Sequence, residues 1–259
     1  NYVQSKGGAI ELSCSIDCED LTILIDHNDF EGNSAVQGGA VHWKDANAPV
    51  FNNNTYENNT AVYGAVFANG KLSLEMADFE ANTKALKTGT LSDIIVSGQR
   101  VTSSIVVRIK DILGQTVTSD NSTMCQFKVD TSSAITGSYI QSATIGVLNF
   151  SGFTIFSKPG QPFILSISCS PSEIGSLNAE FSLRFCTPGE YQSKTSCEVC
   201  SPGTYSFDPS TQCQECPSEA VCFGRAKVAP KKGYWRSSLV SEDFYECPRE
   251  ESCLALGEQ

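Results

Sequence analysis

The feature that most constrains this chain of 259 residues is the uneven distribution of its twelve cysteines. Residues 1–185 hold four of them and residues 186–259 hold eight, which is about 11% of that last segment. This density is typical of small secreted modules that disulfides hold together. A reducing cytosol would keep the thiols free, so the count predicts an extracellular or cell-surface protein that passes through an oxidising compartment. We expect all twelve to be disulfide-bonded: Cys14, Cys18, Cys125, Cys169, Cys186, Cys197, Cys200, Cys213, Cys216, Cys222, Cys247 and Cys253.

The charge of the chain excludes some partners. It carries 18 basic and 29 acidic residues, a net charge of −11, and such a chain repels the phosphates of nucleic acids. A hydrophobic content of 40% is too high for a disordered tail. No apolar run of about 18 residues is present, so no membrane span is expected within these residues, and the start shows no basic-then-apolar leader. We expect a soluble part of a larger protein.

Four Asn-x-Ser/Thr sequons are compatible with an extracellular glycoprotein, although it is the cysteines that predict the compartment. Asn53 and Asn58 lie in an asparagine-rich stretch that we interpret as a solvent-facing corner, and Asn121 lies in a predicted turn. Asn149 falls in a strand-like run, so we rank it below the other three.

Residues 1–100 contain a repeat. Phe-Glu-Gly-Asn at 30–33 recurs as Tyr-Glu-Asn-Asn at 56–59 and as Phe-Glu-Ala-Asn at 79–82. Gly-Gly-Ala at 7–9 recurs at 38–40 and, degraded, within Tyr-Gly-Ala-Val at 63–66. A period between 20 and 30 residues predicts a solenoid, and the short β-rich runs with Gly and Asn corners favour a parallel β-helix over helical repeats. The expected strands include the runs at 21–25, 40–43 and 72–74.

The alternating Gly-Gly-Ala-Ile/Val and Phe-x-x-Asn motifs resemble the repeats of polymorphic outer membrane proteins. The resemblance covers residues 7–83, in three coils, and implies a right-handed β-helix displayed on a cell surface. The second glycine of the pair is missing from the third copy, so we expect that corner to be built differently.

Residues 101–185 follow another pattern, with strand-like runs at 104–109, 125–129, 145–150 and 163–169 separated by turn residues. This spacing predicts a β-sandwich, and the order of the motifs resembles immunoglobulin-like modules of bacterial and protist surface proteins. Cys125 and Cys169 are then expected on facing strands, where they cross-link the core. The alternative is a further β-helix coil with irregular insertions.

Residues 186–259 form a predicted disulfide ladder. Cys-x-Pro-Gly-x-Tyr at 186–191 recurs at 200–205, a pattern similar to the cysteine-rich modules of ephrin-receptor-like and tumour-necrosis-factor-receptor-like ectodomains. Gly-Tyr-Trp-Arg at 233–236, followed by two more cysteines, resembles the continuation found in large protist surface proteins. The resemblance and the short loops imply four pairs: Cys186–Cys197, Cys200–Cys213, Cys216–Cys222 and Cys247–Cys253.

Two other interpretations of these cysteines stay open. Cys197 and Cys200, followed by Cys213 and Cys216, have the spacing of a four-thiolate zinc ribbon. A Cys-x2-Cys pair is also typical of redox-active dithiols, although no βαβ pattern surrounds this one. We favour abutting disulfide loops, and we predict no metal and no cofactor.

One acidic cluster could support catalysis. Parallel β-helices can host polysaccharide lyases and glycosidases, which use paired carboxylates, and Asp26, Asp29 and Glu31 lie close in sequence with His27 between them. No Lys or Arg accompanies these acids, which favours a solvated corner. Trp43 could stack a sugar ring, but packing inside a coil is the simpler expectation. We therefore predict no catalytic residues and no enzyme.

The predicted function is structural or adhesive, as a subunit of a surface filament or assembly; a ligand-binding ectodomain is the alternative. The expected partners are other copies of this chain or further segments of it, with glycans as another candidate. A β-helix edge without a cap recruits a partner, so we predict such contacts at residues 1–11. Residues 225–236 hold five cations and no acid, and could meet acidic glycans or a neighbour's acidic coils; a solvated linker is the plainer interpretation.

Overall fold

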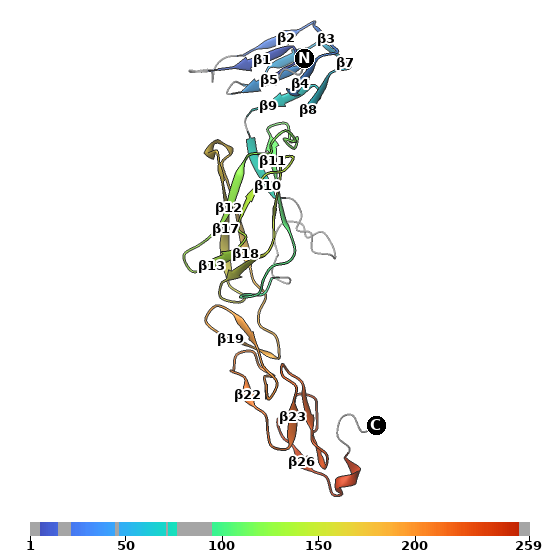
Figure 1. Cartoon of the computed structure of the whole chain (residues 1–259), viewed down its shortest axis with the longest axis vertical. Helices are drawn as coiled ribbons and strands as arrows, with labels where there is room; N and C mark the ends of the chain where they lie inside the picture. The colour runs from blue at the N-terminus through green and yellow to red at the C-terminus, as the bar shows by residue number, and fades with distance from the viewer. Residues whose placement is uncertain (1–5, 15–21, 45–46, 71, 77–94, 254–259) are drawn as a thin grey trace.

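The computed structural model describes residues 6–14, 22–44, 47–70, 72–76 and 95–253. Within these ranges the fold is almost entirely β: it holds 26 strands, two short 3-10 helices and no α-helix. The molecule is elongated, with a stack of parallel strands at one end, two larger sheets in the middle and a chain of small hairpins at the other end (Figure 1). We call these parts the coils, the middle module and the tail.

The coils consist of strands that pair in parallel with the strand one repeat later. The three-stranded order is β1-β5-β9, and the other pairs are β2–β6, β3–β7 and β4–β8. The strands are β1 (Ile10–Ser13), β2 (Leu24–Asp26), β3 (Asp29–Glu31), β4 (Ser34–Gln37), β5 (Val41–Lys44), β6 (Val50–Asn52), β7 (Thr55–Glu57), β8 (Thr60–Tyr63) and β9 (Phe67–Asn69). Residues buried inside the stack include Ile25, Phe30, Val41 and Trp43.

The repeated asparagines bind one coil to the next. Asn33 Nδ2 donates to Asn59 Oδ1 at 2.9 Å, and Asn59 Nδ2 donates to the carbonyl of Phe30 at 2.8 Å. Asn28 and Asn54 make the same kind of pair at the neighbouring corner. These contacts satisfy corner groups that no strand ladder reaches, which explains why Phe-x-x-Asn repeats with the coil.

The repeated glycines allow the coils to approach each other. Gly38 has a φ of 66°, in the left-handed region that glycine adopts without strain. A Cβ on Gly39 would lie 2.0 Å from the carbonyl oxygen of Ala65, so no larger residue fits between these two coils. In the third copy Gly64 keeps the positive φ of 66°, and Ala65 stands at the second position. Only the second position of the pair therefore differs from the other copies, and the φ of the corner is unchanged.

The coils end earlier than the boundary at residue 100 that the sequence predicted. The run at 72–74, expected in a coil, belongs to β10 (Leu72–Met76), which pairs antiparallel with β11 (Ile105–Asp111) of the middle module. Leu72, Leu74 and Met76 pack against the core of that module, which satisfies their alternating apolar pattern. The third Phe-x-x-Asn copy, at 79–82, lies outside the described residues.

The middle module has a three-stranded sheet in the order β10-β11-β15 and a four-stranded sheet in the order β14-β12-β17-β18, with β13 paired to β16. All of these pairs are antiparallel. The remaining elements are β12 (Met124–Val129), β13 (Ala134–Gly137), β14 (Ile140–Ser142), β15 (Val147–Phe150), β16 (Phe153–Phe156), β17 (Pro162–Ser170), η1 (Ser172–Ile174) and β18 (Ser176–Ser182).

Side chains from both sheets share one core, where Phe127 stacks on Phe150 with ring centroids 3.9 Å apart. The disulfide Cys125–Cys169 is present, but its position differs from the one expected. The two residues face each other in register on adjacent strands, β12 and β17, of the same sheet. It therefore ties two neighbours of one sheet together and does not join facing sheets.

The tail is a succession of small antiparallel hairpins, β19–β20, β21–β22, β23–β24 and β25–β26. Their disulfides are Cys186–Cys197, Cys200–Cys213, Cys216–Cys222 and Cys247–Cys253, the same pairs that the resemblance implied. The elements are β19 (Glu190–Gln192), β20 (Cys197–Val199), β21 (Thr204–Tyr205), β22 (Gln214–Glu215), β23 (Ala220–Cys222), β24 (Val228–Pro230), β25 (Tyr234–Trp235), β26 (Tyr245–Glu246) and η2 (Glu250–Ser252).

Candidate functional site

The most elaborate polar contacts that join different parts of the chain lie at two junctions. The upper junction joins the coils to the turn after β11. Gln115 Nε2 donates to the carbonyl of Phe67 at 3.0 Å, and Thr118 Oγ1 donates to the carbonyl of Val62 at 2.6 Å. Both acceptors belong to the last strands of the stack, where no further coil is described. The turn of the middle module therefore caps part of that edge.

Tyr63 and Asp111 form the buried centre of the upper junction. The Tyr63 hydroxyl lies 2.5 Å from Asp111 Oδ2, and Asp111 also accepts hydrogen bonds from the amides of Leu113 and Gln115. Burial, reinforced by the neighbouring Asp111 carboxylate, raises the pKa of Tyr63. The tyrosine therefore stays a neutral donor, and Asp111 holds both the turn and the coil edge.

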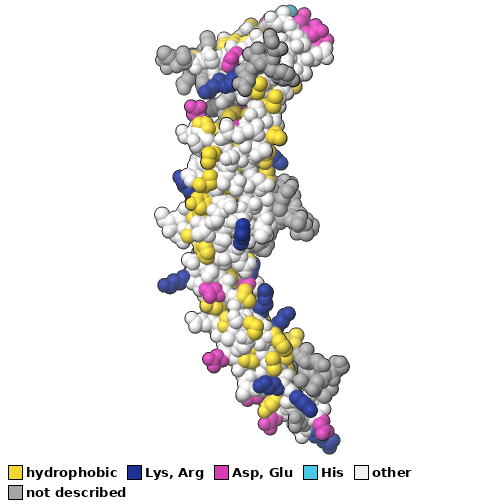
Figure 2. Space-filling model, in the orientation of Figure 1, with side chains coloured by type: hydrophobic (Ala, Val, Ile, Leu, Met, Phe, Trp, Pro, Cys, Tyr) yellow, Lys and Arg dark blue, Asp and Glu magenta, His cyan; other side chains and the backbone are white. Residues whose placement is uncertain are grey.

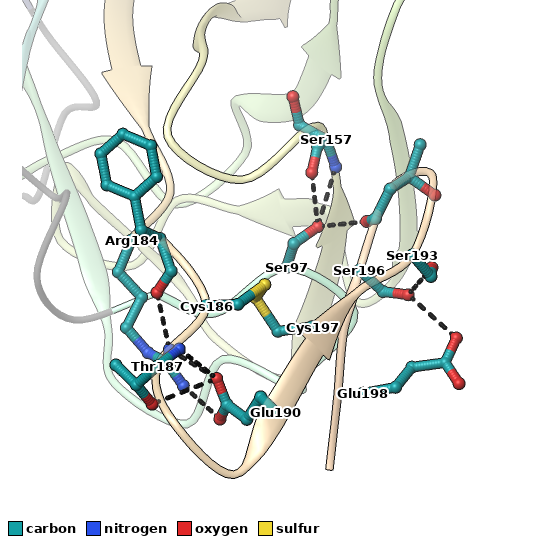
Figure 3. Close-up of a disulfide and its surroundings, with 12 residues drawn as sticks. Ser97, Ser157, Arg184, Cys186, Thr187, Glu190, Ser193, Ser196, Cys197 and Glu198 are labelled. Atoms are coloured by element: carbon teal, nitrogen blue, oxygen red, sulfur yellow. Dashed lines mark hydrogen bonds and ion pairs between the residues drawn. A yellow bond between two sulfur atoms is a disulfide. The ribbon is translucent and has the colours of Figure 1, made fainter. Parts of the chain in front are cut away.

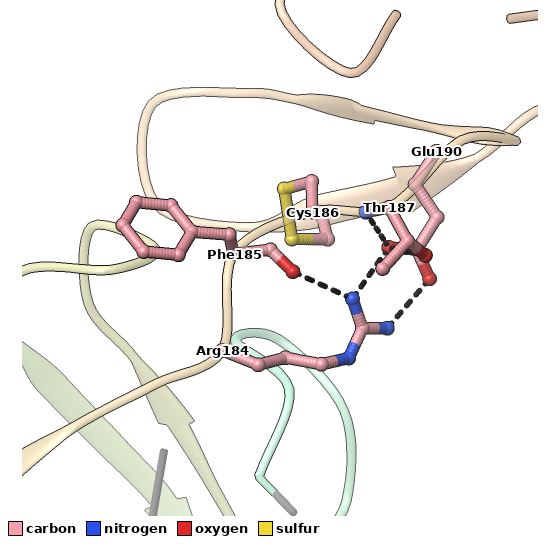
Figure 4. Close-up of polar contacts among 6 residues, drawn as sticks. Arg184, Phe185, Cys186, Thr187 and Glu190 are labelled. Atoms are coloured by element: carbon pink, nitrogen blue, oxygen red, sulfur yellow. Dashed lines mark hydrogen bonds and ion pairs between the residues drawn. A yellow bond between two sulfur atoms is a disulfide. The ribbon is translucent and has the colours of Figure 1, made fainter. Parts of the chain in front are cut away.

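The lower junction joins the middle module to the first hairpin of the tail. Arg184 and Glu190 form a two-pronged ion pair, with Nη1 2.8 Å from Oε2 and Nη2 2.7 Å from Oε1 (Figure 4). The amide and hydroxyl of Thr187 also donate to Glu190, and Arg184 Nη1 donates to the carbonyl of Phe185. The hydrogen bonds from Arg184 are the main reason why the pKa of Glu190 lies below its usual value, and they raise the pKa of Arg184.

Ser97 fastens the other side of the same hairpin. Its hydroxyl lies 2.7 Å from the carbonyl of Ser157 and 2.5 Å from the carbonyl of Thr195, and it accepts the amide of Ser157 (Figure 3). Ser97 is fully buried, so these bonds are shielded from water. The disulfide Cys186–Cys197 lies between the two clusters, so the hairpin is held to the middle module on both sides (Figure 3).

The cysteines that the structure describes lie in disulfides, so they leave no thiolate to bind a metal. The ligand atoms of Cys186, Glu190 and Cys197 lie within 4.8 Å of one another, but both sulfurs belong to a disulfide and offer no thiolate. The zinc-ribbon and dithiol alternatives for Cys197, Cys200, Cys213 and Cys216 are wrong for the same reason. No free cysteine is present in the described ranges; Cys14 is disulfide-bonded, and Cys18 lies outside them.

The acidic cluster lies on the exposed outer surface of the coils. Acidic side chains gather at that end of the molecule (Figure 2), and Ile25 and Phe30 point inward between them. Asp26 accepts a hydrogen bond from Asn53 Nδ2 and lies 2.8 Å from His27 Nδ1, while Asp29 accepts the hydroxyl of Thr55 at 2.6 Å. Asp26 and Asp29 therefore each bind the following coil.

Trp43, the candidate for stacking a sugar, is fully buried in the coils. Its ring packs against Phe51 and Phe67, with centroids 6.2 and 6.4 Å away. His42 precedes Trp43 in β5, so its side chain points to the opposite face of the strand. It is buried as well, and burial lowers its pKa. Neither ring has a surface on which a sugar could stack.

The four sequons are all exposed. Asn53 and Asn58 occupy corners of the coils with φ of 47° and 53°, as the asparagine-rich stretch predicted. Asn121 lies in a turn, and its Oδ1 accepts the amide of Ile145. Asn149 lies in β15 and faces outward from the sheet.

Two side chains of the basic stretch 225–236 make defined contacts within the tail. Lys231 Nζ donates to the carbonyl of Ser218 at 2.8 Å, and Arg236 lies over the rings of Phe207 and Phe244, 5.9 Å from each centroid. Arg236 also donates to the carbonyl of Val228. At least two of the five cations therefore hold the hairpins of the tail together.

Sequence reasoning missed the residues of both junctions. One signal was available: the first Pro-Gly motif continues with Glu190, whereas the second has Thr204 at the same position. A difference between two otherwise matching copies points to a contact that only one copy makes.

Comparison with protein-family models, curated proteins and solved structures finds no match to this chain. Among its described residues, no helix is long and apolar enough to cross a membrane.

Proposed function

We propose that this chain is a non-enzymatic structural or adhesive segment of an extracellular glycoprotein, working as a rigid spacer in a surface filament or assembly. In this proposal the coils are the end of a parallel β-helix, the middle module is an immunoglobulin-like sandwich and the tail is a receptor-like cysteine-rich ladder. The five described disulfides support an oxidising, extracellular location.

The observation that carries the proposal is the pair of junctions. Modules joined by plain linkers move independently, but here side chains of one module hydrogen-bond to the backbone or side chains of the next. Gln115 and Thr118 hold the coil edge, and Ser97 and Arg184 hold the first hairpin of the tail. Such joints suit a protein whose function is to keep its two ends apart.

The acidic cluster gives the enzyme alternative no support. Asp26 and Asp29 bind Asn53 and Thr55 of the neighbouring coil on an exposed surface, and no Lys or Arg is paired with them in the part of the chain that the structure describes.

The assembly contact in this proposal is the first edge of the coils. β1 pairs with β5 on one side only, and no described strand pairs with its other side. In a parallel pair of strands, the amides of successive residues point to opposite sides. The residues on either side of Glu11 direct their amides to β5, so the amide of Glu11 points to the unpaired side. We propose that another copy, or a preceding segment of the same protein, pairs there; residues 1–5 lie outside the described ranges.

Negative-stain imaging of the native material tests this function. The expected result is filaments, or rods joined end to end, in which hydrogen exchange protects the amides of Glu11 and Ser13. Separate rods with freely exchanging amides at both positions would contradict the proposal. Bound oligosaccharide with turnover at the acidic cluster would favour the enzyme, and a membrane-anchored single rod would favour a ligand-binding ectodomain.

A further inference from the structure

The tail contains three hairpins of one design. Each opens on a glycine with positive φ, at Gly189, Gly203 and Gly233. In each, the amide of the cysteine at the end of the hairpin donates to the carbonyl of that glycine: Cys200 to Gly189, Cys216 to Gly203 and Cys247 to Gly233. The hairpins, at 186–200, 200–216 and 230–247, can therefore be compared position by position.

The third hairpin departs from the other two at the cross-strand pair that holds the second residue after the opening glycine. In the first hairpin the Tyr191 hydroxyl donates to Glu198, and in the second the Tyr205 hydroxyl donates to Gln214. The third places two aromatic residues opposite each other: Trp235 faces Tyr245, with ring centroids 5.4 Å apart. A polar partner has been replaced by a second ring.

These rings belong to an exposed apolar surface. Trp235 is 45% exposed and Tyr245 is 50% exposed, and the loop between them carries Leu239 and Val240, which are 81% and 65% exposed. Hydrophobic side chains are visible over this part of the tail (Figure 2). We call these four residues the apolar tip. Exposed apolar residues gathered in one place mark interaction sites more often than scattered ones do.

The contact between the second and third hairpins shows how such rings are covered in this molecule. Tyr205, at the position equivalent to Trp235, is buried in a cluster that includes Phe207 and Phe244, and Phe244 comes from the third hairpin. The ring of Tyr205 is therefore covered by residues of its own hairpin and of the hairpins that follow it. No described segment covers the ring of Trp235 in this way.

Charge favours a second copy as the partner. The hairpin 230–247 carries three cations and three acids, so its net charge is 3 − 3 = 0, whereas the whole chain carries −11. Two copies that meet at this hairpin add no net repulsion, whereas two copies that meet at residues 1–100 bring together segments of charge 6 − 13 = −7 each, and Lys232 of each copy can face Glu242 and Asp243 of the other. We propose that the apolar tip binds the apolar tip of a second copy in a two-fold symmetric contact.

This contact is independent of the coil edge proposed above, and the chain offers a way to separate the two. It has only two tryptophans: Trp43, buried in the coils, and Trp235 in the apolar tip. In a Trp43→Phe variant of the full chain, Trp235 is the sole tryptophan reporter. Its emission should shift to shorter wavelength as protein concentration rises, because association removes water from its ring. Association through the coil edge would leave this emission unchanged.

Sedimentation velocity of the full chain provides the second measurement. We expect a concentration-dependent dimer whose dissociation constant rises at least about tenfold when Leu239→Ser and Val240→Ser are combined. The matched control is Ile164→Ser, since Ile164 is 51% exposed on β17 of the middle module and lies outside the tip. Mass measurement before and after reduction checks that each variant keeps its disulfides.

Three results would overturn the proposal: a chain that stays monomeric at every concentration, a double variant that associates as tightly as the control, or a dimer with unchanged Trp235 emission. A monomer whose Trp235 emission shifts only when an oligosaccharide is added would assign the apolar tip to a glycan.

Discussion

Replacing Glu190 with glutamine tests the lower junction with the smallest change of shape. The Glu190 side chain is 6% exposed and accepts two hydrogen bonds from Arg184 and two from Thr187. Glutamine keeps the size but offers one oxygen, and its amide protons would oppose a guanidinium donor. The substitution therefore removes the negative charge and leaves a donor of Arg184 without an acceptor.

The cost follows from the burial of the pair. Hydrogen bonds to charged groups contribute about 1.5–3 kcal/mol, and breaking a fully buried ion pair costs about 3–5 kcal/mol. The Arg184 side chain is 21% exposed, so water replaces part of the lost contact. The expected loss of stability therefore lies in the lower of these two ranges. We expect Glu190→Gln to destabilise the closed junction by about 2 kcal/mol.

Native-state hydrogen exchange over residues 184–200 measures this effect directly. A loss of about 2 kcal/mol corresponds to exchange about thirtyfold faster, since 1.4 kcal/mol is a factor of ten. Glu198→Gln is the control, because Glu198 is exposed on the same hairpin and accepts only side-chain hydroxyls, from Tyr191 and Ser196. Equal exchange in the two variants would refute the idea that the ion pair holds the junction.

The same pair makes the junction sensitive to pH. The pKa of Glu190 in the folded chain is lowered, chiefly by Arg184, so this carboxylate adds stability above its unfolded-state pKa. That contribution is lost as pH falls through the lowered, folded-state pKa. The difference in protection between wild type and Glu190→Gln should therefore be largest near neutral pH and vanish in acid. A constant difference at all pH values would assign it to packing.

Three further predictions concern the coils, the disulfides and the glycans. Gly39→Ala should lower the free energy of unfolding of the coils by more than about 3 kcal/mol in a thermal unfolding experiment, because the added Cβ meets a backbone oxygen at 2.0 Å. In the control Gly32→Ala the added Cβ meets nothing within 4 Å, so the loss should be only about 1–2 kcal/mol. Equal losses in the two variants would contradict this prediction. Alkylation followed by mass measurement should modify all twelve cysteines only after reduction, whereas free thiols with bound zinc would count against the prediction. Glycosidase treatment should change the masses of peptides with Asn53, Asn58 or Asn121 more often than those with Asn149, and unchanged masses throughout would weaken the extracellular interpretation.

The repeats predicted the parallel stacking of the coils because their residues have local structural roles. Asn33 and Asn59 bind each other across one repeat, and Gly39 is required by the coil beside it. The end of the stack was missed for a physical reason: an apolar residue at every second position suits any half-buried strand, so Leu72–Met76 fits a coil and an antiparallel sheet equally well. Ala65 was the available signal, since its methyl stands where the tightly stacked copies have only glycine.

The cysteine pairs of the tail were implied by the resemblance together with the short loops, because a short loop leaves few partners within reach. The pairing of Cys125 with Cys169 was also expected, but its position was not. Residues on adjacent strands and residues on facing sheets can both point into one core, and alternation along the chain does not distinguish them. Ser97 and Thr195 lie 98 residues apart, so no local pattern could predict their contact at the lower junction.

The third hairpin of the tail shows how the loss of a disulfide changes what a repeat needs from its surroundings. The first two hairpins are closed by Cys186–Cys197 and Cys200–Cys213, while the equivalent positions of the third hold Pro230 and Phe244. Arg236, held over the rings of Phe207 and Phe244, takes over part of that role without a covalent bond. A disulfide acts mainly by constraining the unfolded chain and needs no neighbour, whereas buried rings stabilise only while something covers them. The stability of this hairpin therefore depends on its contacts, with the second hairpin on one side and, in our proposal, with the apolar tip of another copy on the other.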